Sequence, residues 1–248
     1  MKPLCILALA SALIIIPSCK KEEPVYNGDG GKTPVPEAVD LGIMVEKADG
    51  TEYNVKWASW NLGASSEAES GDYLCWGEIY AKEHYVWEEY KYHYGPYQNK
   101  VTKYCDEPSE WGGKKRKPDG IMSLLSEDDA ATVRLGGRWR IPSKAEAEAL
   151  FATKSNTADY TWTYEIIGGK PGWRITWNQN GNNIFIPLAY SIEQDKLYDY
   201  GKPSGRYWTK DLETSIFVYI MCFTSDSGAY CVHRERFDGM TVRPVCVE

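Results

Sequence analysis

The sequence contains few of the residues on which catalytic and metal sites most often depend. Only 3 of its 248 residues are histidine, and it has no CxxC, HExxH or GxSxG motif. These absences argue against a zinc or iron site and against a hydrolase-type serine nucleophile. Carboxylates are plentiful, but a glycosidase needs two of them at a defined separation across a cleft, which a sequence does not reveal. We therefore expect no enzyme activity, no catalytic residue, no metal and no cofactor.

Positive charge is also scarce. From residue 36 onward, 24 basic residues stand against 32 acidic ones, a balance of −8. Such an acidic surface argues against nucleic acid as a partner, because binding to phosphates depends on clustered Lys and Arg. The one basic run, KKRK at 114–117, is predicted to be a solvated loop.

The chain has no apolar run long enough to span a membrane as a helix. The longest run extends from Leu4 to Ile16, whereas a spanning helix needs about 20 apolar residues. Lys2 precedes this run and the small residue Ser18 follows it, which is the pattern of a secretory signal. Residues 1–18 are therefore predicted to be a signal peptide.

A single cysteine, Cys19, follows the small residue at the end of the signal. This junction resembles the lipobox of bacterial lipoproteins, in which the cysteine is lipid-modified and becomes the first residue of the mature chain. The alternative is an ordinary cleaved signal with an incidental cysteine. Acyl chains contribute about 0.8 kcal/mol per buried methylene, so two or three of them anchor a domain firmly. The resemblance implies lipidation at Cys19 and a membrane partner through the lipid anchor.

The residues after Cys19 indicate a tether and a destination. The sequence KKEE at 20–23 resembles the export signal that sends Bacteroidetes lipoproteins to the cell surface. Residues 19–36 hold Gly, Pro and charge with little to bury, so they are predicted to be a lipidated flexible tether. The expected location is the outer membrane, with the domain facing the cell exterior.

Five cysteines remain once Cys5 leaves with the signal and Cys19 takes lipid, so at least one of the five is unpaired. If a four-residue loop at 225–228 joins two strands, Cys222 lies directly across from Cys231, at a distance that permits a disulfide. A turn centred on 227–228 instead sets Cys222 across from His233 and excludes that bridge. Both registers are compatible with the sequence.

Two segments have the start and stop signals of helices. Residues 126–129 fit a capping box, the run to Leu135 is helix-compatible, and two glycines follow it. Ser143 begins a second capping box ahead of AEAEALFA at 145–152. A short extended link that ends at Pro142 separates the two helices.

After residue 160 the sequence predicts a succession of strands. The Asn180-Gly181 pair predicts a two-residue hairpin turn that pairs Trp177 with Ile184, Ile175 with Ile186 and Trp173 with Leu188. These six side chains share one face, so the tryptophans are expected to pack in the core. Other strands are expected near 206–209, 216–223, 229–234 and 240–247, and a further pair around 48–50. Strands at both ends that enclose two helices indicate an α+β fold, with the terminal strands joined in one sheet.

Several short motifs, taken in order and with their spacing, are similar to one family. They are EAVDLG at 37–42, VKWA at 55–58, NLGA at 61–64, GDYLCWGE at 71–78, EDDAA at 127–131, GGRWRIPSKAE at 136–146, YWT at 207–209 and VRPVC at 242–246. Residues 37–248 resemble the Fibrobacter succinogenes major paralogous domain family of Bacteroidetes lipoproteins, which is related to C-type-lectin-like and sulfatase-modifying-factor-like folds. The resemblance implies a lectin-like domain with two helices and a mostly antiparallel twisted sheet.

The sequence departs from this family and its lectin relatives at two places. Trp60 stands where many family members carry a cysteine. The residue that pairs with that cysteine in the family, for example one at the position of Cys246, therefore has no such partner in this chain. Asp211 and Glu213 follow Trp208, but their spacing does not reproduce the calcium motif of C-type lectins. A calcium site is therefore not carried over from the resemblance.

Aromatic residues suggest where a ligand would bind. The chain holds 18 Tyr and 10 Trp against 5 Phe, and rings with a polar edge favour half-wet surfaces. The densest cluster lies at 84–97. One hypothesis is an exposed stacking surface for sugar rings or a protein partner; the alternative is that these rings pack a long loop against the domain. The candidate ligand-binding residues are Tyr85, Trp87, Tyr90, Tyr92, Tyr94 and Trp208.

The sequence thus predicts a surface-anchored lipoprotein with a non-catalytic, lectin-like domain that binds a glycan first and an extracellular protein second. A competing interpretation is a structural or accessory subunit of a surface assembly such as a fimbria. No obvious donor strand is visible in the sequence.

Overall fold

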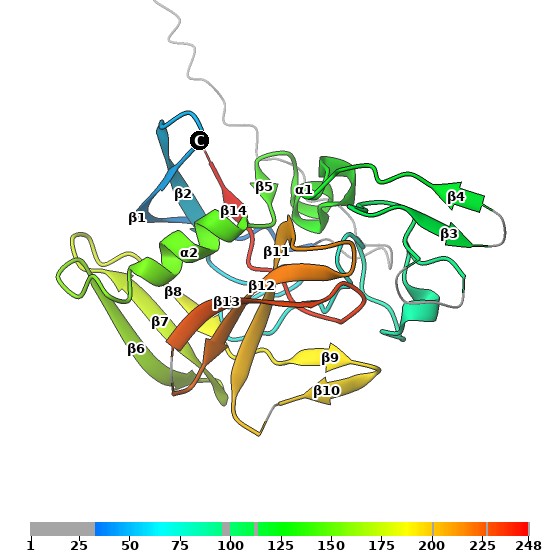
Figure 1. Ribbon diagram of the computed structural model, residues 1–248. Helices are drawn as coiled ribbons and strands as arrows, with labels where there is room; N and C mark the ends of the chain where they lie inside the picture. The colour runs from blue at the N-terminus through cyan, green and yellow to red at the C-terminus, as the bar shows by residue number, and fades with distance from the viewer. Residues whose placement is uncertain (1–32, 96–99, 112–113, 200, 227, 248) are drawn as a thin grey trace, which may run out of the picture.

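The computed structural model describes residues 33–95, 100–111, 114–199, 201–226 and 228–247 (Figure 1). The predicted signal peptide (1–18), the lipidation site Cys19 and most of the tether (19–36) lie outside the described residues. In the described ranges, no helix is both long enough and apolar enough to cross a bilayer.

The two ends of the domain meet in one sheet. β1 (Ala38–Glu46) and β2 (Glu52–Ala58) form the predicted hairpin, and β14 (Val245–Cys246) pairs with both β2 and β5 (Trp139–Arg140). The sheet order is β1-β2-β14-β5. The predicted joining of the terminal strands is confirmed. β14 is shorter than the strand expected at 240–247, because the chain before it makes only isolated bridges.

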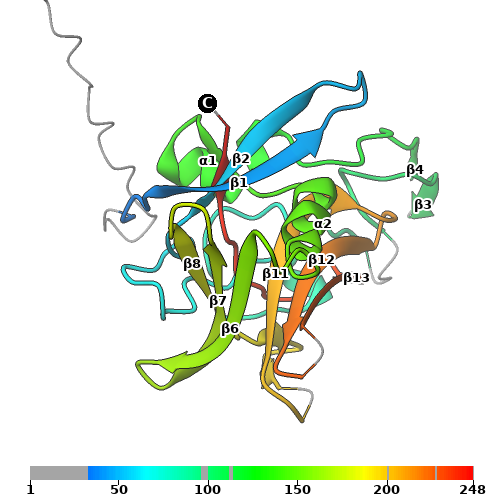
Figure 2. The same cartoon turned by 90° about the vertical axis from the view of Figure 1, so that its left-hand side faces the viewer.

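Two three-stranded antiparallel sheets form most of the remaining body (Figure 2). One consists of β6 (Tyr160–Ile167), β7 (Lys170–Trp177) and β8 (Asn183–Pro187). The other consists of β11 (Ser204–Leu212), β12 (Phe217–Thr224) and β13 (Gly228–Glu235). The Trp173 indole N–H donates to the Thr224 carbonyl at 2.9 Å and links the two sheets. Helix α2 (Lys144–Ala152) packs on β1, β11, β12 and β13.

The two predicted helices are present, and the first begins later than expected. Residues Ser126–Asp128 form a single 3₁₀ turn (η2), and α1 (Ala130–Leu135) is capped by Asp129, whose carboxylate accepts from the Thr132 N–H at 3.0 Å. The capping box of α2 is confirmed. The Glu146 N–H donates to Ser143 Oγ at 3.2 Å, and the Ser143 N–H donates to Glu146 Oε2 at 2.7 Å.

The predicted β7–β8 hairpin exists with a different register. Trp173 pairs with Ile186 and Ile175 with Ile184, because the Trp177 N–H bonds to the Asn182 carbonyl and the connection uses four residues, 178–181. The shift is two residues, and side chains alternate with period two, so the same face remains buried. The predicted pairs are wrong, but the prediction that the tryptophans pack against the core is confirmed.

The register of β12 and β13 excludes the predicted disulfide. Cys222 pairs with Tyr230, and Cys231 pairs with Met221, so the two thiols lie on opposite faces of the sheet. Thr224 pairs with Gly228 across a three-residue connection, one residue shorter than the loop that would place the cysteines opposite each other. In the described residues no disulfide joins any of the five cysteines, Cys75, Cys105, Cys222, Cys231 and Cys246.

Two short hairpins project from the body (Figure 1). β3 (Ser109–Trp111) and β4 (Lys114–Arg116) form one of them, so most of the basic run lies in a strand rather than in the predicted loop. β9 (Ser191–Glu193) and β10 (Lys196–Tyr198) form the other. In the described residues the sheets are mostly antiparallel and accompany two short α-helices, which is compatible with the predicted α+β class and with a mainly β one.

Candidate functional site

The aromatic segment at 84–94 is buried, so the predicted exposed stacking surface is wrong. Tyr94 is half-buried, and the other candidate rings are at most 5% exposed. The Trp208 indole N–H donates to the Leu74 carbonyl at 2.7 Å, deep in the core. The alternative, rings that pack a loop against the domain, is what the structure has. The buried candidates are Tyr85, Trp87, Tyr90, Tyr92 and Trp208.

A buried arginine explains why Tyr90 and Tyr92 face inward. Arg236 has no exposed surface, and its guanidinium lies 4.9 Å from the Trp76 ring centroid and 5.3 Å from that of Tyr90. Its Nε donates to the Tyr90 hydroxyl at 2.8 Å, and one terminal nitrogen donates to the carbonyls of Tyr104 and Ser215. A desolvated cation over aromatic faces is strongly stabilising. The segment therefore encloses Arg236 and is a structural element.

The same segment positions a neighbouring hairpin. The β9–β10 turn has Gln194 and Asp195 at φ 48° and 63°, the left-handed pair that a tight two-residue hairpin turn requires. The Asp195 carboxylate accepts from the Tyr85 N–H at 2.5 Å and lies 3.0 Å from His84 Nδ1. On its other side, Ile192 exchanges two backbone hydrogen bonds of 2.8 Å with Gly239. The hairpin is thus held at both its tip and its base.

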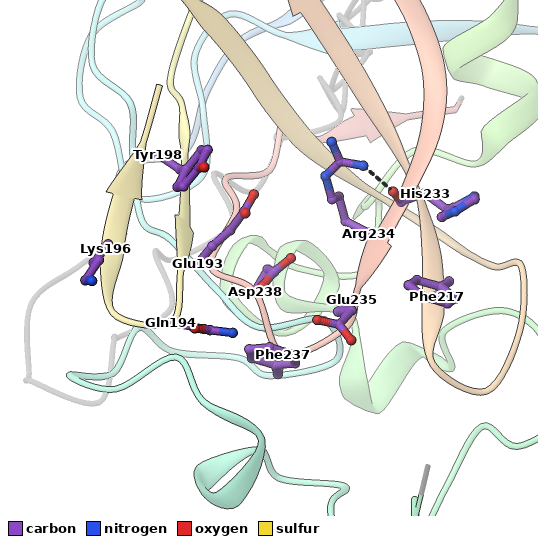
Figure 3. Close-up of a pocket in the computed structure, with 10 residues that line it drawn as sticks. All are labelled: Glu193, Gln194, Lys196, Tyr198, Phe217, His233, Arg234, Glu235, Phe237 and Asp238. Carbon is purple, nitrogen blue, oxygen red and sulfur yellow. Dashed lines mark hydrogen bonds between the residues drawn. The ribbon is translucent and has the colours of Figure 1, made fainter. Parts of the chain in front are cut away.

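A cavity of about 580 Å³ lies between this hairpin and the end of β13 (Figure 3). We call it the β9–β13 cleft. Its volume falls within the range of about 300–1,000 Å³ that is typical of small-molecule sites. It is lined by Glu193, Gln194, Lys196, Tyr198, Phe217, His233, Arg234, Glu235, Phe237 and Asp238.

Three carboxyl groups gather at this cleft. Glu193 and Asp238 flank the bridge between Ile192 and Gly239, which places them on adjacent chain segments, and Figure 3 shows them together with Glu235 around its centre. Asp238 is only 4% exposed. Within the described part of the chain, no side chain makes a hydrogen bond or an ion pair with its carboxyl group.

The surroundings of Asp238 favour its neutral form. Burial raises the pKa of Asp238 to about 8, and the negative charges of Glu193 and Glu235 act in the same direction. Arg234 and Arg206 lower this pKa, but each has a smaller effect than either glutamate. At neutral pH the cleft therefore holds a carboxylic acid, which both donates and accepts hydrogen bonds.

Of the other two carboxyl groups, that of Glu193 is held in place by partners. Ser191 Oγ donates to Glu193 Oε1 at 3.0 Å, and Arg206 Nη1 lies 3.8 Å from the same oxygen. Burial raises the pKa of Glu235. The cleft thus combines one anchored acceptor, Glu193, with the buried acid Asp238.

Asp128 shows how differently an acid behaves when the fold pairs it. Burial alone would raise the pKa of Asp128, but hydrogen bonds from Lys103 at 2.5 Å, from Lys91 at 2.8 Å and from Tyr104 at 2.6 Å hold it well below its usual range. The hydrogen-bonding capacity of the Asp128 carboxylate is therefore used by partners within the fold. The Asp238 side chain has no such partners among the described residues, which favours the β9–β13 cleft as the functional site.

Two other hollows are weaker candidates. One of about 600 Å³ lies among residues 63–72 with Gly168 and Lys170, and its Asp72 is already paired with Arg134 at 2.7 Å. Another of about 230 Å³ adjoins the β9–β13 cleft, with Phe217 lining both. In the described residues no group of His, Cys, Asp and Glu is arranged to hold a metal ion.

The sequence did not single out the cleft. The alternation in SIEQDKLY at 191–198 could have indicated a hairpin, but its turn lacks the usual Asn-Gly or Gly-Gly pair. Nothing local in the sequence connects Glu193 to Asp238, which the Ile192–Gly239 bridge brings together.

Comparison with protein-family models, with curated proteins and with solved structures gives no match. The resemblance to the Fibrobacter succinogenes major paralogous domain family therefore stays a prediction. The site has to be argued from its own chemistry.

Proposed function

We propose that this protein is a non-catalytic binding module that takes a saccharide in the β9–β13 cleft. The observation that carries the proposal is Asp238, a buried acid that lines the cavity and makes no hydrogen bond through its side chain to any described residue. A polar group buried without a partner is costly, so such a group is expected to meet one in a ligand. Sugar hydroxyls, which donate and accept, match a carboxyl group in either protonation state.

The rest of the cleft has the composition that a saccharide needs. Glu193 and Glu235 supply acceptors, and the Arg234 guanidinium supplies donors. Tyr198, which is 46% exposed, and the half-buried Phe217 supply ring faces against which C–H groups of a sugar pack. This mixture of flat apolar surface and directed polar groups supports a glycan ligand over a purely apolar one.

The same proposal includes the anchor and the family. A lipid on Cys19 at the start of a tether would hold the domain, residues 37–248, on the outer membrane with the cleft facing the exterior. The ordered motif set supports membership of the Fibrobacter succinogenes major paralogous domain family and a C-type-lectin-like fold. The pairing of the two terminal strands in one sheet is consistent with that fold.

A glycan array tests this function. The wild-type protein is expected to retain one or a few related saccharides, and Glu193→Lys, which puts a cation into the cleft, is expected to abolish that binding. The matched control is Tyr164→Ala, since Tyr164 is an exposed ring on β6 that does not line the cleft. The proposal would be rejected if Tyr164→Ala lost glycan binding while Glu193→Lys kept it. It would also be rejected if the wild-type protein retained no glycan on the array.

A structural subunit of a surface assembly is the second candidate. The observation in its favour is that two hairpins expose large apolar side chains, Ile166 at 68% and Leu197 at 61%. Analytical ultracentrifugation of the protein decides between the two. The assembly function would be favoured if the wild-type protein formed polymers at high concentration and Ile166→Ser or Leu197→Ser prevented their formation.

A further inference from the structure

The charges around Asp238 do not balance at the position of its carboxyl group. Four strands around the cleft contribute charged residues: Glu193 from β9, Lys196 from β10, Arg206 from β11, and Arg234 and Glu235 from β13. The two glutamates are the largest charge effects on Asp238, ahead of both arginines. The local field is therefore negative, although the three basic side chains outnumber the two glutamates.

The positions of the basic groups explain this imbalance. The Arg234 guanidinium donates to the His233 carbonyl at 2.8 Å, and Arg206 is directed to Glu193. Lys196 is exposed, and Figure 3 shows its side chain pointing away from Asp238. The centre of the cleft, between Glu193, Glu235 and Asp238, is therefore left to the carboxyl groups.

We propose that the β9–β13 cleft selects a saccharide that carries a free amino group, whose ammonium ion lies among Glu193, Glu235 and Asp238. This inference rests on the proposed saccharide function and names the class of sugar. An ammonium group has three N–H donors, and the carboxyl groups of Glu193 on one segment and of Glu235 and Asp238 on another match them in number. Hydrogen bonds between an ammonium ion and carboxylates are about twice as strong as neutral ones.

Binding of an ammonium ion is expected to release a proton from Asp238, whereas binding of a neutral sugar is not. Asp238 is mostly protonated at pH 7, because burial and the neighbouring glutamates raise its pKa to about 8. A cation beside it favours the carboxylate, so the acid loses its proton to the buffer as the amino sugar binds. Glucose, which brings no charge, leaves that proton in place.

Three monosaccharides that differ only at C2 test the inference: D-glucosamine, D-glucose and N-acetyl-D-glucosamine. Each is titrated into the whole wild-type protein at pH 7 and followed by ¹⁵N NMR, with shifts expected at 193–198 and 233–238. Glucosamine is expected to bind about tenfold more tightly than the other two. Calorimetry in phosphate and in Tris is expected to report release of up to one proton for glucosamine and none for glucose.

Asp238→Asn is the matched variant, since the amide has the shape of the protonated acid but cannot ionise. It is expected to lose the tenfold preference for glucosamine over glucose and to release no proton. Glu148→Gln removes an exposed carboxylate on α2 and is expected to change nothing. Unchanged NMR spectra away from the cleft verify that each variant is folded.

The outcomes separate the two levels of the proposal. Equal binding of all three sugars at the cleft would overturn the amino-sugar inference and leave the saccharide function standing. A glucosamine preference that survives in Asp238→Asn would also overturn it, because the cation would then bind elsewhere. No shift at the cleft with any of the three sugars would overturn the inference, while the glycan array decides the broader function.

Discussion

Glu193 and Asp238, 45 residues apart in the sequence, lie side by side because the bridge between Ile192 and Gly239 joins their chain segments. Like charges at such neighbouring positions destabilise a fold. The structure keeps them together at a cavity, and one of them stays protonated near neutral pH. Strained electrostatics of this kind mark functional sites more often than structural ones.

Asp238 makes stability depend on pH. Its folded-state pKa of about 8 lies above the ordinary aspartate value, so the native state holds a proton that the unfolded state has lost between about pH 4 and pH 8. The free energy of unfolding therefore falls as pH rises through this window. Compared with the wild type, Asp238→Asn is expected to gain at least about 1.4 kcal/mol between pH 5 and pH 8, the value of one pKa unit. Urea unfolding at the two pH values measures this gain. If the free energy of unfolding fell equally in both proteins between pH 5 and pH 8, Asp238 would not be the protonated buried acid described above.

Arg236 is predicted to be a large single contributor to stability. Lysine cannot reproduce its fork, so Arg236→Lys leaves the Tyr104 or Ser215 carbonyl without a donor, at about 1–3 kcal/mol for each such group. We expect the free energy of unfolding to fall by more than about 2 kcal/mol. The control, Arg138→Lys, alters an exposed side chain and is expected to stay within about 0.5 kcal/mol. If the free energy of unfolding of Arg236→Lys changed as little as that of the control, the proposed stabilising role of the buried Arg236 guanidinium would be refuted.

The cap of α2 gives a graded prediction. Ser143→Ala removes one capping bond and is expected to cost about 1 kcal/mol. Glu146→Ala is expected to cost about 3 kcal/mol or more, because Glu146 is fully buried and also binds the Tyr53 hydroxyl at 2.8 Å and the Arg140 guanidinium. Chemical denaturation measures both. Equal effects of the two substitutions would show that Glu146 acts only as a cap.

The thiols of the domain are predicted to be reduced and slow to react. Burial raises the pKa of Cys231 to about 12, and that of the Cys75 thiol rises for the same reason. Iodoacetamide is therefore expected to label the folded protein poorly. After denaturation without reductant, peptide mapping should find all five domain cysteines alkylated. A linked peptide pair containing Cys222 and Cys231 would contradict the observed register.

Cys19→Ala is predicted to release the protein from the membrane without changing its fold. The acyl chains supply the membrane affinity in this account, so the variant should move from the membrane fraction to the aqueous fraction and lose incorporation of labelled fatty acid. Cys5→Ala, within the predicted signal, serves as the control and should remain anchored. Unmodified Cys19 in the native protein would remove the basis for the anchor.

Local signals predicted local structure well. Ser143 and Glu146 identify the start of α2, and β1, β2, β7, β8, β11, β12 and β13 lie approximately where alternation and turn residues predict strands. β3, β4, β9 and β10 are not predicted by these signals. Register was harder, because the connection between β12 and β13 accommodates loops of different length, and a difference of one residue moves Cys231 to the other face of its sheet. Strand positions are therefore more predictable than strand partners.

Burial of the aromatic segment and formation of the cleft depend on distant residues. Tyr90 is buried because Arg236, 146 residues away, occupies the space beneath it. Nothing near Tyr90 in the sequence reveals this cation. Likewise, Asp238 becomes a site residue only when β9 reaches Gly239. Both are consequences of tertiary contacts that composition and spacing do not encode.

Hydrogen–deuterium exchange in the presence of a saccharide retained on the glycan array tests the central claim most directly. Protection is expected at 193–198 and 233–238, the segments that form the cleft, and this protection is expected to be lost in Glu193→Lys. Protection confined to other surfaces, such as the exposed ends of β6 and β7, or protection that persists in Glu193→Lys, would contradict that claim.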